Sequence, residues 1–144
     1  MLTNKELRYF EIAKSISKLS NFKTTSKHIG CIVVCNSRVI SSGYNSNKTS
    51  PLQKKYNKLR FDCDSTPHTL HAETDALKPL LDRQDIDFRS VKLYIYRERA
   101  NGSKGLAKPC ESCMALIKNL GIREIYYTTE DGYANEQISI GKGD

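Results

Sequence analysis

Two short stretches of the sequence hold the residues best suited to metal chemistry. The first, "HTLHAETDAL" (68–77), places His71 two residues before Glu73, and the second, "KPCESCMALI" (108–117), contains Cys110 and Cys113. Two cysteines three residues apart at a helix N-terminus direct their sulfurs to the same side, and both can bind one tetrahedral zinc ion. Taken alone, however, a single CxxC is equally typical of a redox pair, of half a structural zinc site, or of chance.

His71 can supply a third zinc ligand, because it also lies at a predicted helix start and two such helices can meet over a sheet. Three protein ligands leave a fourth position for water, which is typical of a catalytic rather than a structural zinc, and the pKa of that water falls to about 7. Glu73 projects elsewhere and is close enough to accept the proton of the water and pass it to a leaving group.

Considered separately, His71 and Glu73 would be interpreted as a capping histidine and a helix-start carboxylate. Together with the cysteines they form H-x-E followed by P-C-x-x-C, which is much more specific than either half. This combination is the signature of zinc deaminases, in which an activated water attacks C4 of cytosine or C6 of adenine.

The elements that would position these residues follow from apolar periodicity and turn residues. Thr3 and Glu6 form a capping-box pattern at the start of the first helix, and Pro79 is expected to kink or break the second. A short basic helix is predicted within 52–59, and at most one further strand within "EQISIG" (136–141). The main predicted elements are helices at 3–20, 70–83 and 110–120, and strands at 29–36, 38–43, 91–98 and 123–129.

The order of these elements predicts an α/β protein, a three-layer α/β/α sandwich with a mixed sheet covered by helices on both faces. The first two strands would form an antiparallel hairpin, and strand, helix, strand over 91–129 implies a right-handed parallel crossover. A chain of 144 residues fits a single domain, residues 1–144. Neither a signal peptide nor a membrane span is evident, so we expect a cytoplasmic protein without membrane association.

The net charge indicates which partners the protein could bind, and the number of cysteines indicates how they are used. The formal net charge is +7, and residues 48–60 contain five basic residues and no acidic one. An anionic partner, either a nucleotide phosphate or a nucleic acid backbone, would match this charge, although a solvated basic surface explains it equally well. Five cysteines in a chain of this kind favour metal binding or burial over a disulfide framework.

Between residues 29 and 129 the sequence resembles the cytidine and deoxycytidylate deaminase superfamily, through "GYN", "LHAETDAL", "KPCESCMALI" and "LGIREIYY". The resemblance implies a cytidine deaminase-like sandwich. Histidine as the first ligand is similar to the deoxycytidylate and nucleic-acid deaminase branches. The roles that the resemblance implies are zinc ligation by His71, Cys110 and Cys113, proton transfer by Glu73, and contact with the base or sugar by Asn45, Ala72 and Pro109.

The leading functional hypothesis is zinc-dependent hydrolytic deamination of a cytosine nucleotide, dCMP to dUMP, with release of ammonia. The alternative is a cytosine or adenine deaminase acting on single-stranded DNA or RNA, which the charge and the tyrosines Tyr126, Tyr127 and Tyr133 would favour. A non-catalytic module with a structural zinc would need a fourth protein ligand. Cys63 and His68 could hold a second zinc. By analogy with the family, we expect a homo-oligomer.

Overall fold

The computed structural model describes residues 2–20, 28–49 and 69–138. Its main sheet is mixed and six-stranded, with strand order β2-β1-β5-β7-β8 and with β6 paired to β5, while β3 and β4 form a separate two-stranded sheet. The strands are β1 (His28–Cys35), β2 (Arg38–Tyr44), β3 (Ser46–Thr49), β4 (Thr69–Leu70), β5 (Val91–Glu98), β6 (Lys104–Gly105), β7 (Glu124–Thr128) and β8 (Tyr133–Gln137).

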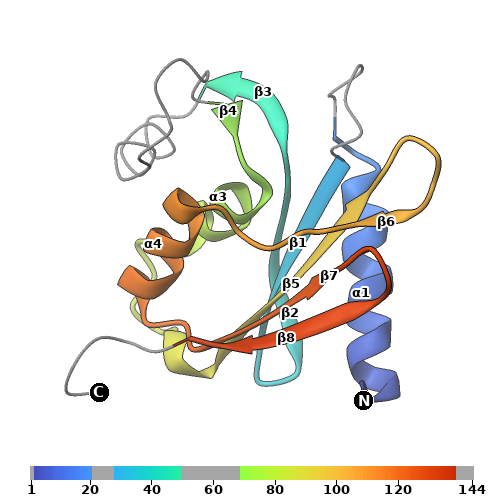
Figure 1. The fold of residues 1–144 in the computed structure, drawn as a ribbon. Helices are drawn as coiled ribbons and strands as arrows, with labels where there is room; N and C mark the ends of the chain where they lie inside the picture. The colour runs from blue at the N-terminus through green and yellow to red at the C-terminus, as the bar shows by residue number, and fades with distance from the viewer. Residues whose placement is uncertain (1, 21–27, 50–68, 139–144) are drawn as a thin grey trace.

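Helices cover both faces of the main sheet, as Figure 1 shows. Helix α1 (Asn4–Ser17) packs on one face, and α3 (Ala72–Leu77) and α4 (Glu111–Leu120) pack on the other. The core is accordingly divided by the sheet into two apolar clusters, one under α1 and one under α3 and α4. The predicted three-layer α/β/α sandwich with a mixed sheet is confirmed.

Helix α1 begins where the sequence predicted. The Glu6 amide donates to Thr3 Oγ1 at 3.1 Å and the Thr3 amide donates to Glu6 Oε1 at 2.8 Å, so the capping box is complete. The helix ends at Ser17, earlier than the predicted residue 20. Phe10 is fully buried against the sheet and makes edge-to-face contacts with Tyr94 and Tyr126.

This packing decides the role of the tyrosines near the end of the chain. Tyr126 stacks on Tyr94 with ring centroids 4.5 Å apart beneath α1, and Tyr133 lies 4.4 Å from Phe10. Tyr127 is buried on the opposite side, in the cluster under α3 and α4. Tyr126 and Tyr127 are buried in the core, and Tyr133 is partly buried against Phe10, so the idea that these rings stack on nucleic-acid bases is not supported.

The β1–β2 hairpin is antiparallel, as predicted. Its turn residues Asn36 and Ser37 both have positive φ, 52° and 66°, which is the conformation that tight hairpin turns require and that asparagine tolerates well. The pairing of β5 with β7 is parallel, with α4 between them in the chain, which confirms the predicted parallel connection.

Several predicted boundaries were wrong. Helix α3 ends at Leu77 and continues only as a 3-10 turn, η1 (Lys78–Leu80), because Pro79 has no amide proton to extend the α-helix. A second 3-10 turn, η2 (Phe88–Ser90), precedes β5. Strand β8 begins at Tyr133, before the predicted position, and β3 and β6 lie where no strand was predicted. Leu70, which was predicted to begin a helix, is the last residue of β4.

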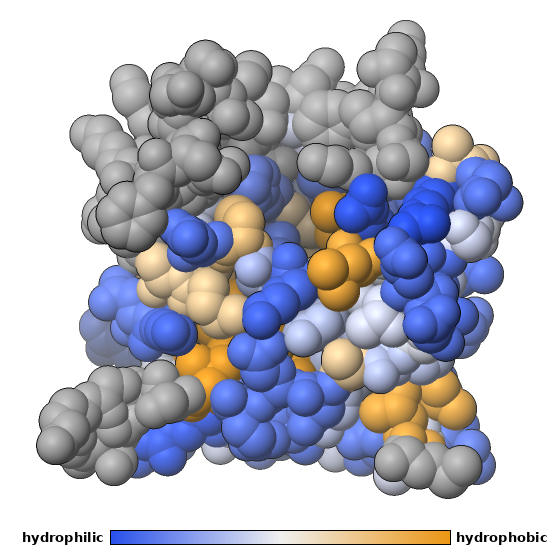
Figure 2. Space-filling view, in the orientation of Figure 1, coloured by the Kyte–Doolittle hydropathy of each residue, from blue (hydrophilic) through white to orange (hydrophobic). Residues whose placement is uncertain are grey.

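Some sequence predictions fall outside the described residues. These are the short basic helix, the cluster Lys54, Lys55, Lys58 and Arg60, and the possible second zinc site at Cys63 and His68. Among the residues that are described, no helix is both long and apolar enough to cross a membrane. Hydrophilic side chains cover much of the face seen in Figure 2, with smaller hydrophobic areas between them.

Candidate active site and metal centre

His71 and Cys110 occupy equivalent places at the starts of two helices. His71 is the N-cap of α3 and Cys110 is the N-cap of α4, and both have extended backbones, with ψ values of 156° and 173°. Neither side chain makes a capping hydrogen bond to its helix. The interpretation of His71 as a capping histidine is therefore wrong, and both side chains are directed to the space between the helices.

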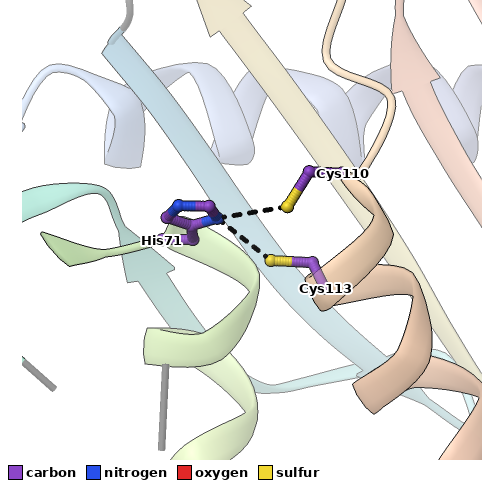
Figure 3. Close-up of side chains that lie close together, drawn as sticks. All are labelled: His71, Cys110 and Cys113. Atoms are coloured by element: carbon purple, nitrogen blue, oxygen red, sulfur yellow. Dashed lines mark hydrogen bonds between the residues drawn. The ribbon is translucent and has the colours of Figure 1, made fainter. Parts of the chain in front are cut away.

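The third member, Cys113, completes a compact group of ligand atoms. His71 Nδ1 lies 3.2 Å from Cys113 Sγ and 3.5 Å from Cys110 Sγ, and the three ligand atoms all lie within 4.8 Å of one another (Figure 3). Zinc–sulfur bonds of about 2.3 Å and zinc–nitrogen bonds of about 2.0 Å place tetrahedral ligands roughly 3.5 Å apart. One nitrogen and two sulfurs at these separations fit zinc.

No fourth His, Cys, Asp or Glu joins this group within the described part of the chain. A structural zinc site of the usual kind has four protein ligands, whereas a catalytic site has three and keeps one position for water or substrate. Within the described residues the group therefore has three ligands, the number that a catalytic zinc site uses.

The two thiols interact strongly with each other. A hydrogen bond from Cys113 lowers the pKa of Cys110 to about 3, helped by His71 and opposed by burial, and the same contact raises the pKa of Cys113 well above its ordinary value. The hydroxyl of Ser112 also lies 3.1 Å from Cys110 Sγ. The contact therefore favours the thiolate form of Cys110 and the thiol form of Cys113, and a bound cation would favour the thiolate form of both.

Glu73 lies beside the metal ligands in the first turn of α3. Its side chain is only 5% exposed, and burial raises the pKa of its carboxyl to about 7, with the positive charge of His71 acting in the opposite direction. The Cys113 thiol acts in the same direction as His71 and also lowers this pKa. A carboxyl group with a pKa near neutrality can both accept and donate a proton at physiological pH.

Contacts with β2 hold α3 in place, and no sequence pattern predicted them. The Tyr44 amide donates to Asp75 Oδ2 at 3.1 Å, and the Ser41 hydroxyl donates to the Ala76 carbonyl at 2.6 Å. Gly43 lies between them, where an added Cβ would be only 2.3 Å from the Ala76 nitrogen. Ser41, Gly43 and Tyr44 are distant in sequence from the H-x-E motif, so only the fold reveals that they support it.

Asn45 lies on the metal side of the sheet. In the β3–β4 pair Ser46 is opposite Leu70, so Asn45, which precedes Ser46, and His71, which follows Leu70, adjoin the same end of this pair. Asn45 is 6% exposed, and its Oδ1 accepts a hydrogen bond from the Ile29 amide at 2.9 Å. Part of its hydrogen-bonding capacity therefore fastens β1 to the start of β3, and its contact with a base or sugar stays a prediction.

Ala72 and Pro109 are both buried next to the ligand-bearing residues. Ala72 is the first residue of α3 and is in the core cluster beneath that helix, and Pro109 immediately precedes Cys110. The structure thus brings together the metal ligands, Glu73 and the two positions expected beside the substrate. The roles of Ala72 and Pro109 in binding remain predictions.

Comparisons with known proteins agree with this geometry. The family model described as "Cytidine and deoxycytidylate deaminase zinc-binding region" matches residues 3–129. No curated protein sequence matches the chain.

Solved structures similar to this fold include two of dCMP deaminase from the cyanophage S-TIM5. The apo form is 24% identical with a TM-score of 0.60, covering 90% of this chain and 86% of that one. The form in complex with dCMP and dUMP is 22% identical with a TM-score of 0.60, covering 90% and 84%. Cytidine deaminase from Burkholderia pseudomallei is 17% identical with a TM-score of 0.63, covering 94% and 93%.

The family match spans both ligand motifs and nearly the whole described chain, and the His71, Cys110 and Cys113 group fits the zinc ion that the family binds. The chain belongs to the zinc-binding cytidine and deoxycytidylate deaminase family.

Proposed function

We propose that the protein catalyses the zinc-dependent hydrolytic deamination of a cytosine nucleotide, converting dCMP to dUMP with release of ammonia. The observation that carries this proposal is the buried carboxyl of Glu73 beside a group of three zinc-binding side chains. A structural zinc site has no use for such a carboxyl group, whereas hydrolysis of an amine needs a proton carrier.

In the proposed reaction the zinc ion would activate water, and the side chains would hold the metal and transfer protons. His71, Cys110 and Cys113 would hold the zinc, which when bound activates a water molecule for attack on C4 of the base. Glu73 accepts a proton from that water and protonates N3 of the base, and it then passes the proton of the newly formed C4 hydroxyl to the departing amino group as the C4 carbonyl forms. Its burial excludes bulk water from these transfers and favours its protonated form, so the carboxyl can hold the proton between the two transfers.

The substrate pocket would form around the residues beside the ligands. We assign the side chain of Asn45 to the base or sugar, and the backbone at Ala72 and Cys110 to hydrogen bonds with the base, with Pro109 beside it. Burial of Ala72 and Pro109 supports this, because a base needs an apolar, water-excluding surface as well as polar partners.

A nucleotide is favoured over a nucleoside by two observations. The histidine ligand resembles the deoxycytidylate branch, and a similar fold, that of the cyanophage dCMP deaminase, has been solved with dCMP and dUMP. The net charge of +7 also suits a phosphorylated substrate. We further expect a homo-oligomer, which size-exclusion chromatography with light scattering would test, and a cytoplasmic location.

The second candidate is deamination of cytosine or adenine in single-stranded DNA or RNA. The five basic residues between 48 and 60 favour it, since a polymer presents several phosphates. Polymer binding should weaken steeply as salt increases, whereas binding of one nucleotide should change little. A gel-shift titration with a single-stranded oligonucleotide separates the two, and absence of binding at low salt would exclude the polymer.

The deciding experiment measures ammonia release by the zinc-loaded protein with cytidine, CMP, dCMP and single-stranded oligonucleotides. We expect turnover with dCMP, loss of at least about a thousandfold of kcat in Glu73→Gln, and an unchanged zinc content in that variant. Glu111→Gln is the matched control, because Glu111 is an exposed carboxylate in the first turn of α4. Full activity of Glu73→Gln would remove Glu73 from the mechanism.

A further inference from the structure

We propose that Arg97 binds the phosphate group of the nucleotide substrate. This inference rests on the proposed function, since it names the group that distinguishes a nucleotide from a nucleoside at the same site. Arg97 is near the carboxyl end of β5, and its amide donates to Thr128 Oγ1, at the carboxyl end of β7, at 3.1 Å. Ligands of open α/β sheets bind outside the carboxyl ends of parallel strands.

The position of Arg97 in the sheet places it on the same side as the metal ligands. Along β5 the alternate residues Val91, Leu93 and Ile95 face the cluster under α3 and α4, and Arg97 continues this alternation. Arg97 pairs with Ile29, whose amide is bonded to Asn45 Oδ1. Asn45 and Arg97 are therefore separated by about two strand spacings, roughly 10 Å. This is comparable to the separation of base and phosphate in a nucleoside monophosphate.

The side chain of Arg97 is held by the segment that leads to the zinc ligands. Its Nη1 donates to the Leu106 carbonyl at 3.2 Å, and an added Cβ on Gly105 would be only 2.9 Å from Arg97 Cδ. The same segment is fixed to the sheet by the Ala107 amide, which donates to the Thr128 carbonyl at 2.9 Å. Figure 1 shows this segment passing from β6 to α4. The hydrogen bond to Leu106 therefore places the guanidinium beside the segment that leads to Cys110.

Arg97 differs from the other basic residues of this segment in having no counter-charge. Arg99 pairs with Glu130 at 2.7 Å, Lys108 pairs with Glu136 at 3.6 Å, and Lys104 lies over the Tyr133 ring at 5.2 Å. Within residues 97–110, all of which are described, Arg97 is the cation that has neither a carboxylate nor an aromatic ring as partner.

The guanidinium also retains hydrogen-bonding capacity. Its Nε is shielded from solvent and has no acceptor among the described residues, which is costly for a buried donor. A phosphate supplies both negative charge and several acceptor oxygens, and the planar fork of arginine matches it better than lysine would. A small rotation of the side chain toward an anion would satisfy the Nε donor and neutralise the charge together.

The test compares substrates that differ only in the phosphate. Binding of dCMP and deoxycytidine to the zinc-loaded protein is measured by isothermal titration calorimetry, alongside kcat/KM for both. In Arg97→Gln we expect the Kd and KM for dCMP to rise roughly 10- to 100-fold, with deoxycytidine little changed. Arg97→Lys should retain part of the preference, because it keeps the charge but not the fork.

Arg99→Gln is the matched control. It also removes one positive charge, only two residues along the chain, but Arg99 is already neutralised by Glu130. The inference would be overturned if Arg97→Gln kept the wild-type preference for dCMP, or if it lost affinity for dCMP and deoxycytidine equally. If the variant lost affinity only for single-stranded oligonucleotides, the assignment to a mononucleotide would be overturned. Arg97-dependent binding of dCMP without ammonia release would support the phosphate site and reject the proposed reaction. Turnover of dCMP that does not depend on Arg97 would support the proposed reaction and reject the phosphate site.

Discussion

Gly43 in β2 is the position where a single methyl group should test the link between fold and metal centre most directly. An added Cβ at Gly43 would lie 2.3 Å from the Ala76 nitrogen and 2.7 Å from the Ala72 carbonyl oxygen, both in the backbone of α3. Ordinary contacts of this kind are about 3.4 Å or longer. The Gly43→Ala variant can therefore fold only if α3 moves away from β2 by about 1 Å.

Such a movement has two measurable effects. Overpacking of this kind usually costs about 1–3 kcal/mol of the free energy of unfolding. The movement would also displace His71, the N-cap of α3, relative to Cys110 and Cys113. Metal–ligand distances tolerate only about 0.2 Å of error, so we expect zinc affinity to fall roughly 10- to 100-fold.

Gly30→Ala provides a control with equal crowding on the other face of the sheet. Its Cβ would lie 2.2 Å from the Ala13 carbonyl oxygen and 2.5 Å from the Ser17 nitrogen, both in α1, which holds no zinc ligand. Urea unfolding of the metal-free proteins should show similar destabilisation in both variants. Competition with a chromophoric chelator should show weaker zinc binding in Gly43→Ala alone.

Two results would refute this reasoning. If Gly43→Ala has wild-type stability, α3 is not packed on β2 as closely as the structure shows. If both variants lose zinc affinity equally, general destabilisation explains the loss, and the position of α3 is not the cause. Far-UV circular dichroism before each titration ensures that folded protein is compared with folded protein.

Three further predictions test other parts of the structure. Phe10→Ala should cost about 3–5 kcal/mol in urea unfolding, because the ring is fully buried between α1 and the sheet, and a loss below 1 kcal/mol would contradict that packing. The hydrogen bond from the Thr3 amide lowers the pKa of Glu6, so its charge stabilises the fold above the unfolded-state pKa and this stabilisation disappears as pH falls through the lowered value. Glu6→Gln should accordingly cost roughly 0.5 kcal/mol at pH 7 and nothing in strong acid, and a difference that is independent of pH would contradict this. Removal of zinc by a chelator should abolish activity and lower Tm, and zinc should dissociate on acidification as the two thiolates are protonated, which a zinc-release titration would follow.

The sequence by itself determined the identity of the chemical groups and much of the local structure. Interactions over three or four residues decide three local features that the structure contains. These are the capping box at Thr3 and Glu6, the Asn36–Ser37 turn, and the end of α3 near Pro79. The metal ligands were also evident, since His71, Cys110 and Cys113 belong to short motifs of fixed spacing, and the structure brings them within 4.8 Å.

Only the tertiary structure decided what surrounds those groups, because these contacts join residues that are far apart in the chain and leave no local pattern. Strand register and helix packing decide these contacts. Examples are the hydrogen bond from the Tyr44 amide to Asp75, the close approach of Gly43 to α3, and the position of Arg97 beside Leu106 and Thr128. The burial that raises the pKa of Glu73 to about 7 is likewise a property of the packed core, since a carboxylate in an isolated helix would be solvated and acidic.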